Sequence, residues 1–337
     1  MKSTKARIVD NVVRGGLGIL SLAPLLIVCV LAGYLSWSAW PVFRYMGWHF
    51  FTDPLWSLGN LYAAHPVTVH GVQVMPGASF GALVFIVGTV LTAGLALIIA
   101  VPVALGVAAG SAFFIHGRIR PWAAGLVEMM AGIPSVLYGL WGLTEVAPFV
   151  SHRLGPILNR LLSPLPFVSG PIASQTNLFV AVIVITLMIV PIMAATMRTV
   201  MEQIPPELIA SGLALGWTEG ETFWHVVWPF ARPAVIGGSI LGLGRALGET
   251  MAVLMVSGDA LNILPHNLYS AISTMAATIA GQLDSALTDP TQMGVHALGA
   301  LGFVLFLITI IVNVLARGIV RRAALRINAW NEEDVLP

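Results

Sequence analysis

The sequence predicts an all-α membrane protein with six transmembrane helices. Only 9% of its 337 residues are charged and 57% are hydrophobic, whereas soluble domains carry about 25% charged residues. The apolar residues gather in six stretches, each long enough for a helix of about 20 residues that crosses a bilayer. This composition excludes a soluble enzyme, a disordered chain and a nucleic-acid-binding protein with a concentrated basic face.

The six predicted spans divide the chain into four parts. The first span follows a basic start, as in a signal peptide, but its length and the interfacial cluster Trp37, Trp40 and Trp48 favour a retained anchor. The parts are the N-terminus with this anchor (1–40), an external loop (41–79), a core with five spans (80–316) and a C-terminal tail (317–337). The spans cover residues 17–39, 80–110, 122–143, 178–197, 234–257 and 295–316.

The distribution of Lys and Arg predicts that both termini are cytoplasmic. Twelve of these residues flank the spans on the side of the two termini, and three lie on the other side, at Arg44, Arg153 and Arg160. An excess of basic residues marks the cytoplasmic side of a membrane protein. The twelve are Lys2, Lys5, Arg7, Arg14, Arg118, Arg120, Arg198, Arg232, Arg317, Arg321, Arg322 and Arg326.

The segments expected outside the membrane are long. Residues 41–79 and 144–176 are rich in Pro, Gly, Ser and aromatic residues, which is typical of loops. In the third such segment, residues 258–294, the stretch 267–283 mixes small, hydroxyl-bearing and apolar side chains. That segment is either a short re-entrant or surface helix or an ordered cap.

Three ionisable residues fall inside the predicted spans: Glu128, Arg245 and Glu249. Such residues are costly in a membrane and point to function. One hypothesis is a structural ion pair, since Arg245 and Glu249 are four residues apart and Glu128 could join them. The other is a polar path on which Arg245 binds an anion, because its planar guanidinium group matches phosphate-like oxygens. Ser135 and Thr250 are further candidates for this path.

The charge count and the glycines near these residues bear on both hypotheses. One Arg and two Glu sum to −1, which suits an anion path only if a carboxyl group is protonated or a second subunit adds positive charge.

At helical spacing the glycines share a stripe with the charged residues, and close helix packing is the simpler explanation for them. They are Gly125, Gly132, Gly139 and Gly142 in one span, and Gly238 and Gly242 in the other.

The long cytoplasmic segment 198–232 predicts two short helices joined at Gly216. Pro206 suits the first helical position, Glu207 lies near the positive end of that helix, and Thr218 and Glu221 form a capping box for a second helix that Pro229 stops. Apolar side chains such as Trp224 make the segment a candidate docking site for another protein. The alternative is an amphipathic segment on the membrane surface.

Two strings of residues resemble the PstC-type permeases of phosphate ABC importers. They are EMMAGIPSVLYGLWG (128–142) and GLGRALGETMAV (242–253). The spacing from Gly216 to Pro229 resembles the cytoplasmic coupling motif of the wider class. One departure is Ala210, which stands where that motif has Glu; Glu207 lies one turn earlier.

The resemblance implies a type I ABC importer permease whose core, residues 80–316, carries a coupling loop at 198–232. It implies a PstA-type second permease, a PstB-type ATPase dimer and a PstS-type external phosphate-binding protein, all at a bacterial cytoplasmic membrane. The chain's only lysines, Lys2 and Lys5, preclude a phosphate-binding loop of its own. ATP is therefore expected on a partner, and no enzymatic activity, cofactor or metal is expected here.

Two other classes of function remain possible from the residues. A secondary transporter or ion channel could use the same three charges, with a cation favoured by their negative sum. A purely structural membrane subunit would keep them as an ion pair. The docking segment argues against the first class, and the polar stripes argue against the second.

Overall fold

The computed structural model describes residues 4–165 and 167–333, and within them the side chains of 17, 18, 20–165, 167–315, 317 and 318. The predicted N-terminal and C-terminal parts extend beyond these bounds. Seven of the basic residues from which the orientation in the membrane was predicted also lie outside the described side chains: Lys2, Lys5, Arg7, Arg14, Arg321, Arg322 and Arg326.

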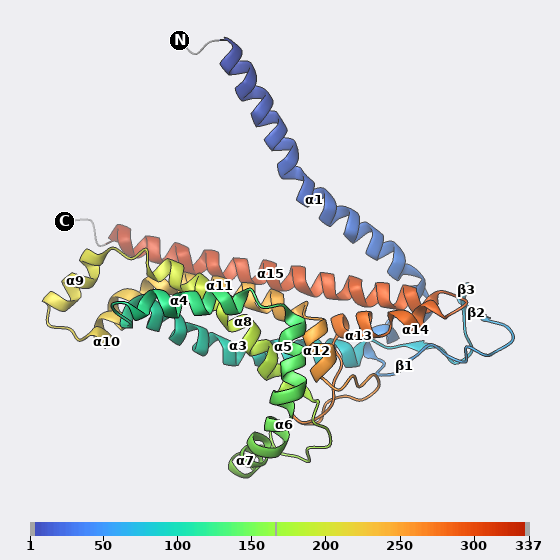
Figure 1. The fold of residues 1–337 in the computed structure, drawn as a ribbon. Coiled ribbons are helices and arrows are strands. Elements are labelled where there is room, and N and C mark those ends of the chain that lie inside the picture. Colours follow the sequence, from blue (N-terminus) through green and yellow to red (C-terminus); the bar gives the residue numbers. More distant parts are fainter. Residues whose placement is uncertain (1–3, 166, 334–337) are drawn as a thin grey trace.

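The predicted architecture of six spans is confirmed in the described residues. Five helices are long and apolar enough to cross a membrane, and the number is six when a helix pair bent by 92° is counted as one span (Figure 1). The five spans are Leu20–Met46 in α1 (Thr4–Met46), Leu83–Phe114 formed by α3 (Leu83–Ala109) and η1 (Gly110–Phe114), α8 (Leu178–Met201), Glu219–Leu247, and Met293–Leu315 in α15 (Met293–Glu333).

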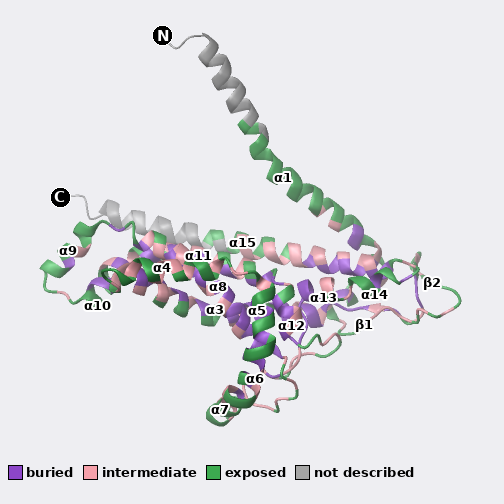
Figure 2. Ribbon diagram, viewed as in Figure 1, coloured by how far each residue is buried: buried purple, intermediate pink, exposed green. Residues whose placement is uncertain are grey.

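The most buried helix is α8, which lies between α3, α11 and α4 (Figure 2). A row of alanines on α3, at every fourth position from Ala96 to Ala108, is fully buried in the same hydrophobic core. Small side chains at helical spacing let two backbones approach closely. The hydroxyl group of Thr186 on α8 donates to the carbonyl group of Ala96 over 3.3 Å, which ties the two helices together.

The helix that contains the fifth span begins far earlier than the predicted span, within the predicted cytoplasmic segment 198–232. Helices α10 (Glu219–Thr222), η4 (Phe223–Val227) and α11 (Trp228–Leu247) follow one another without a break. The prediction that Pro229 stops the second cytoplasmic helix is wrong. Pro229 is the second residue of α11 and lies inside the continuous helix that begins at Glu219. Here a π-helical turn precedes it, so the helix continues through the proline.

The third span is broken at Gly132–Pro134. Helix α4 (Ile119–Ala131) ends there, and the chain continues at 92° as a helical segment, Ser135–Leu161, that leaves the main bundle in Figure 1. The predicted loop over 144–176 is therefore helical as far as Leu161. The segment consists of α5 (Ser135–Trp141), η2 (Gly142–Val146), α6 (Ala147–Phe149), η3 (Val150–Leu154) and α7 (Gly155–Leu161).

The only strands of the described residues lie between residues 56 and 80, in the predicted external loop 41–79 and at its end. Helix α1 continues to Met46 and is followed by α2 (His49–Thr52). A hairpin turns at His70 and Gly71, both with positive φ, which suits a two-residue turn between strands. Two antiparallel pairs form, β1 (Trp56–Ser57) with β4 (Ser79–Phe80) and β2 (Val67–Val69) with β3 (Val72–Val74).

The segment 267–283 packs against the helix bundle, and its second half forms a short helix, as the first of the two predicted alternatives has it, but this helix is partly buried. The first four residues of α13 (Met275–Gly281) are buried, and the fifth, Ile279, packs against the hydrophobic core. The backbone N–H of Met275 donates to the hydroxyl group of Thr89 on α3 over 2.9 Å. Gly88 lies against the carbonyl group of Ser273, so a side chain at residue 88 would collide with this segment. Helix α14 (Leu283–Leu287) follows.

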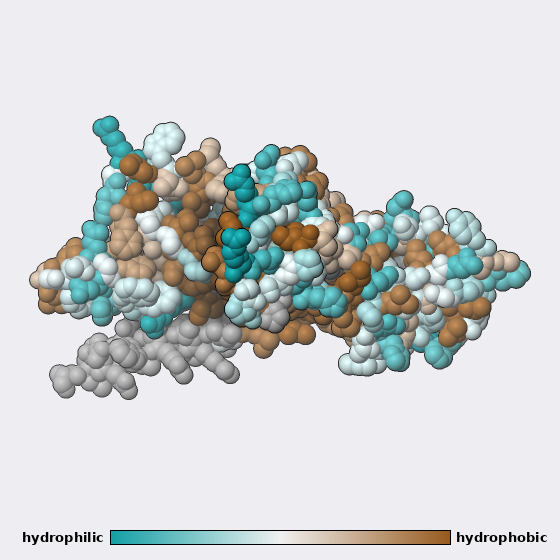
Figure 3. All heavy atoms as spheres, turned by 90° about the horizontal axis from the view of Figure 1, so that it is seen from below, coloured by the Kyte–Doolittle hydropathy of each residue, from teal (hydrophilic) through white to brown (hydrophobic). Residues whose placement is uncertain are grey.

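The two ends of the bundle differ in character. Helices α9 (Pro206–Ala214) and α10 lie near the C-terminal end of α15, and the strands lie at the opposite end (Figure 1). In Figure 3 hydrophobic atoms lie around a hydrophilic cluster at the centre of the view, and pale and hydrophilic atoms are frequent toward the strands. Near the strands α1 is held on α15, where a His296 ring nitrogen lies 2.9 Å from the Ser38 carbonyl oxygen.

Candidate functional site

Two broken spans pack against each other at the candidate site. Helix α11 ends at Leu247, and after a short irregular segment α12 (Met251–Val256) begins. Helix α5, which follows the break in the third span, packs on α12. A Cβ atom at Gly139 would lie 2.8 Å from the Cα atom of Ala252, so this contact requires glycine.

The glycines of the two stripes divide into packing and open positions. A Cβ atom at Gly142 would meet Val184 of α8 at 2.6 Å, and one at Gly242 would meet Met193 of the same helix at 2.5 Å. Gly139 is similarly confined, and a Cβ atom at Gly238 would lie 3.3 Å from the Met193 carbonyl oxygen, a tight contact, so the packing explanation fits these four glycines. Nothing lies within 4 Å of a Cβ atom at Gly125, and Gly132 meets only a carbonyl group of its own turn.

Arg245 and Glu249 do not form the ion pair that their spacing allowed. The helix ends between them, so they no longer share a helical face. Glu249 is 8% exposed, and its carboxylate accepts a hydrogen bond of 3.3 Å from the N–H of Ala252. A carboxylate is stabilised at the start of a helix. Arg245 is exposed and has no ion pair among the described residues.

Glu128 pairs with Arg198, which the sequence analysis places among the basic residues that flank the spans. The Nη2 atom of Arg198 on α8 donates to the Oε1 atom of Glu128 on α4 over 3.0 Å. The same guanidinium group lies 3.5 Å from Glu202, which also pairs with Arg120 over 3.2 Å. The expectation that Glu128 joins Arg245 and Glu249 is therefore wrong.

This arrangement also corrects the charge count. With Arg198 included, positive and negative groups balance within the described network. The sum of −1 came from counting Glu128 without its partner. Of the three ionisable residues predicted inside the spans, Arg245 is the cation, and it lies on an exposed part of α11 with no ion pair among the described residues.

The other two predicted path residues lie at the two breaks. Ser135 is the half-buried first residue of α5, and the hydroxyl group of Thr250 donates to the Gly248 carbonyl group over 3.2 Å. Beside them Tyr138 is 7% exposed and donates to the carbonyl group of Met130 over 2.9 Å.

The coupling segment has the predicted caps. Gly216 has φ +85°, a conformation that L side chains rarely adopt, and follows the end of α9. The capping box is confirmed: Thr218 donates its N–H to the Glu221 carboxylate over 2.8 Å and accepts the N–H of residue 221. The hydrogen bonds from the Thr218 backbone and hydroxyl group hold the pKa of Glu221 below its ordinary value.

Apolar side chains of this segment are exposed beside a groove. Trp224 is 59% exposed and Leu215 is 72% exposed. Trp224 and Phe223 form one wall of an apolar groove of about 390 Å³, and the end of α3 with Phe114 of η1 forms the other. Of the predicted coupling residues, Glu207, Ala210, Gly216, Thr218, Glu221 and Trp224 are exposed, and Pro229 is half-buried.

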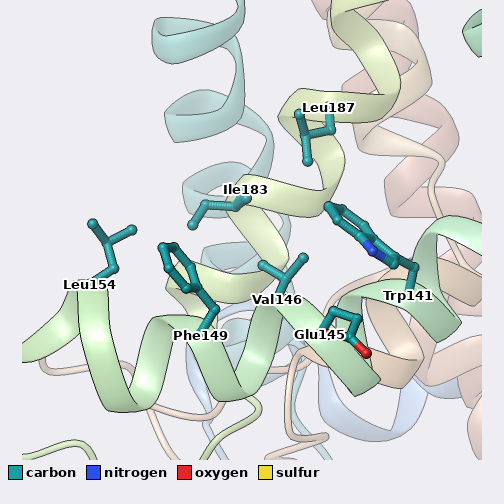
Figure 4. Close-up of a pocket in the computed structure, with 7 residues that line it drawn as sticks. All are labelled: Trp141, Glu145, Val146, Phe149, Leu154, Ile183 and Leu187. Carbon is teal, nitrogen blue, oxygen red and sulfur yellow. The ribbon is translucent and has the colours of Figure 1, made fainter.

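A second cavity of about 610 Å³ lies away from the predicted path residues. It opens between α8 and the segment 141–154, and Figure 4 shows Trp141, Val146 and Phe149 facing Ile183 and Leu187. Glu145 is the one ionisable residue among those that line it. None of the residues predicted for the path or for coupling lines this cavity.

Sequence reasoning missed two residues that the structure brings to the site. Arg198 was counted only as a basic residue at the end of a span, although Glu202 four residues later indicated a local pair. Tyr138 was read as part of an apolar helix. A buried tyrosine hydroxyl group needs a partner, and the proline four residues before it leaves a helix carbonyl group without its usual N–H. That combination was the available signal.

The comparisons with known proteins agree on one family. Residues 100–328 match the family described as binding-protein-dependent transport system inner membrane component. The chain is 40% identical over 313 residues to the phosphate transport system permease protein PstC 1 of Mycobacterium tuberculosis, covering 92% of each chain. It is 33% identical over 314 residues to PstC of Mesorhizobium japonicum, covering 91% of this chain and 90% of that relative.

A solved structure shows the same fold. It is the crystal structure of a bacterial ABC transporter involved in the import of the acidic polysaccharide alginate. The likeness has a TM-score of 0.56 at 16% identity and covers 94% of this chain and 99% of that chain. The relatives are permease subunits rather than enzymes. The resemblance to PstC-type permeases is thus confirmed, and the chain belongs to the family of binding-protein-dependent transport system inner membrane components, as a multi-pass membrane subunit of an ABC importer.

Proposed function

We propose that this chain is the permease subunit of an ATP-driven importer that moves inorganic phosphate across the bacterial cytoplasmic membrane by alternating access. The observation that carries the proposal is Arg245, an exposed guanidinium group where two broken spans meet, with no carboxylate paired to it among the described residues. Guanidinium groups match the oxygens of phosphate in geometry and stay charged at every physiological pH. The names of the relatives, which are phosphate transport permeases, support this substrate.

The proposed complex contains four kinds of subunit. A PstA-type permease completes the path beside the exposed face of α4, α5 and Arg245, and a PstS-type binding protein delivers phosphate from outside. A PstB-type ATPase dimer docks on residues 198–232, where the exposed apolar side chains favour a protein partner. The orientation with both termini in the cytoplasm belongs to this proposal.

The balanced charge network weakens the alternative of a secondary transporter or channel for cations. That alternative drew on an excess of negative charge, and Arg198 removes the excess. In this proposal residue 210, which is Ala, makes no Glu-mediated contact with the ATPase. Movement of the docking segment reaches Arg245 through the continuous helix Glu219–Leu247.

The test is a purified complex in proteoliposomes with the binding protein and each candidate anion. We expect phosphate to stimulate ATP hydrolysis and to accumulate inside, and sulfate to do neither. Stimulation by sulfate and not by phosphate would overturn the substrate. Uptake that persists without ATP while an ion gradient is held would instead support a secondary transporter.

A further inference from the structure

A side chain replaces the backbone hydrogen bond that is lost at the break in the third span. In an unbroken helix the carbonyl group of Met130 would accept the N–H of residue 134, which is a proline and has none. The Tyr138 hydroxyl group donates to that carbonyl group over 2.9 Å, and the N–H of Ile133 reaches it at 3.3 Å. The tyrosine therefore connects α5 back to α4 across the bend.

Polar contacts supplement a partly buried packing surface in holding α4. None of its side chains is fully buried in the described structure, but the helix packs on α8 and its half-buried Val127 contacts the hydrophobic core. Its polar side-chain contacts are the ion pair from Glu128 to Arg198, the pair from Arg120 to Glu202, and the hydrogen bond from Tyr138 to the last turn of the helix. The bend of 92° therefore depends in part on a few polar contacts.

Tyr138 also lies where α5 is fixed to the rest of the site. Its neighbour Gly139 sits directly on Ala252 of α12, and Gly142 one turn later is wedged against Val184 of α8. Because these contacts require glycine, α5 has little freedom on this side. Helix α12, on which α5 packs, follows the end of α11 that carries Arg245 after a short break. A change in the bend would therefore move α4 relative to Arg245 while α5 stays in place.

We propose that Tyr138 is a positioning residue for transport, whose hydroxyl group holds the break between α4 and α5 in its bent form beside Arg245. This inference rests on the proposed function, since it assigns Tyr138 a part in the movement of the substrate past Arg245. The residue acts through the bend and binds no substrate itself. Removal of the hydroxyl group should widen the range of bend angles and slow transport.

The experiment compares Tyr138→Phe with the parent complex by distance measurements and by uptake. Spin labels go on Leu126 of α4 and Leu161 of α7, both well exposed, after replacement of the chain's one cysteine, Cys29, by serine. We expect a broader distance distribution in Tyr138→Phe and an uptake rate lowered about five- to tenfold, as loss of a buried hydrogen bond allows. Tyr62→Phe is the matched control, because Tyr62 is 98% exposed near the hairpin.

A second background keeps the test decisive. Pro134→Ala restores an N–H that can bond to the Met130 carbonyl group, so adding Tyr138→Phe in that background should change the distances less. An equal change in both backgrounds would overturn the proposed role of the hydrogen bond. Slower uptake with unchanged distances would overturn it too. The distances are measured without phosphate or ATP, so a failure here leaves the proposed substrate untouched, and failure of phosphate uptake in the parent complex concerns the function alone.

Discussion

The guanidinium group of Arg198 lies 3.0 Å from the carboxylate of Glu128 and joins the fourth span to the third. The Arg198 side chain is 17% exposed and that of Glu128 is 61% exposed. Arg198 also lies 3.5 Å from Glu202, so one cation serves two carboxylates. The ion pair is therefore largely buried at Arg198 and largely exposed to its surroundings at Glu128.

This asymmetry predicts unequal effects of neutralising the two partners. Glu128→Gln removes an exposed charge and should cost about 1 kcal/mol or less. Arg198→Gln leaves two carboxylates close together without their cation, so it should lower thermal stability clearly more. The measurement is the unfolding temperature of the purified complex, with Arg198→Lys as the control that keeps the charge. Equal shifts for the two neutral variants would show that Glu202 takes no part.

Arg245→Gln should abolish phosphate uptake while the complex still assembles. The side chain is exposed and makes no ion pair among the described residues, so its loss leaves no carboxylate uncompensated. Uptake of labelled phosphate and size-exclusion chromatography of the same preparation measure the two properties. Arg245→Lys keeps the charge without the planar fork and should retain part of the uptake. Normal uptake by Arg245→Gln would remove Arg245 from the path.

Gly139→Ala should destabilise the protein, and Gly125→Ala should not. A Cβ atom at Gly139 would lie 2.8 Å from the Ala252 Cα atom and 3.0 Å from the Met255 sulfur atom. Overpacking of this kind costs about 1–3 kcal/mol. Gly125 lies in a helix with nothing within 4 Å, where alanine is favoured by about 1 kcal/mol. Thermal unfolding in detergent compares the two, and a destabilised Gly125→Ala would reveal a contact with another subunit.

The capping box should contribute to coupling at neutral pH and lose its effect only in acid. The hydrogen bonds from Thr218 lower the pKa of Glu221 below its ordinary 4.5 in the folded segment. A lowered folded pKa means that the stabilisation is complete above the ordinary pKa and disappears as pH falls through the lowered value. ATP hydrolysis stimulated by the loaded binding protein should therefore show no change from this group between pH 6 and pH 8.

Substitution of Glu221 checks the same cap directly. Glu221→Ala should lower stimulated hydrolysis about two- to fivefold, because it frees the start of the helix Glu219–Leu247. Glu221→Gln can still accept the N–H of Thr218 and should lower it less. If both variants behave like the parent, the cap is not needed for contact with the ATPase.

The spans and the caps could be predicted from the sequence, and the tertiary partners could not. Apolar length and the motif from Thr218 to Glu221 are local properties, and the structure has both. The partner of Glu128 is 70 residues away on another helix, and no local pattern shows which basic residue will lie beside it. The pair of Arg245 with Glu249 failed because the helix ends at Leu247, between two residues with good helical spacing.

Pro229 shows why a strong local signal can mislead. Proline usually ends a helix because its ring collides with the preceding turn. Here the preceding turn is π-helical, η4, and the proline lies at the second residue of the next stretch. The continuation depends on a change of helix type that residue preferences do not reveal.

The unbroken helix Glu219–Leu247 has a mechanical consequence, because it crosses α8 close to one of its ends. At 1.5 Å per residue, Gly242, which contacts Met193, lies about 35 Å from Glu219 and about 5 Å from Arg245. If the crossing at Gly242 is the fulcrum, the helix is a lever with very unequal arms. A swing of about 8 Å at the cytoplasmic end then moves the backbone of Arg245 by only about 1 Å. In the proposed complex the long arm would give the ATPase a large mechanical advantage, and the short arm would confine the guanidinium group to a stroke smaller than the width of one water molecule.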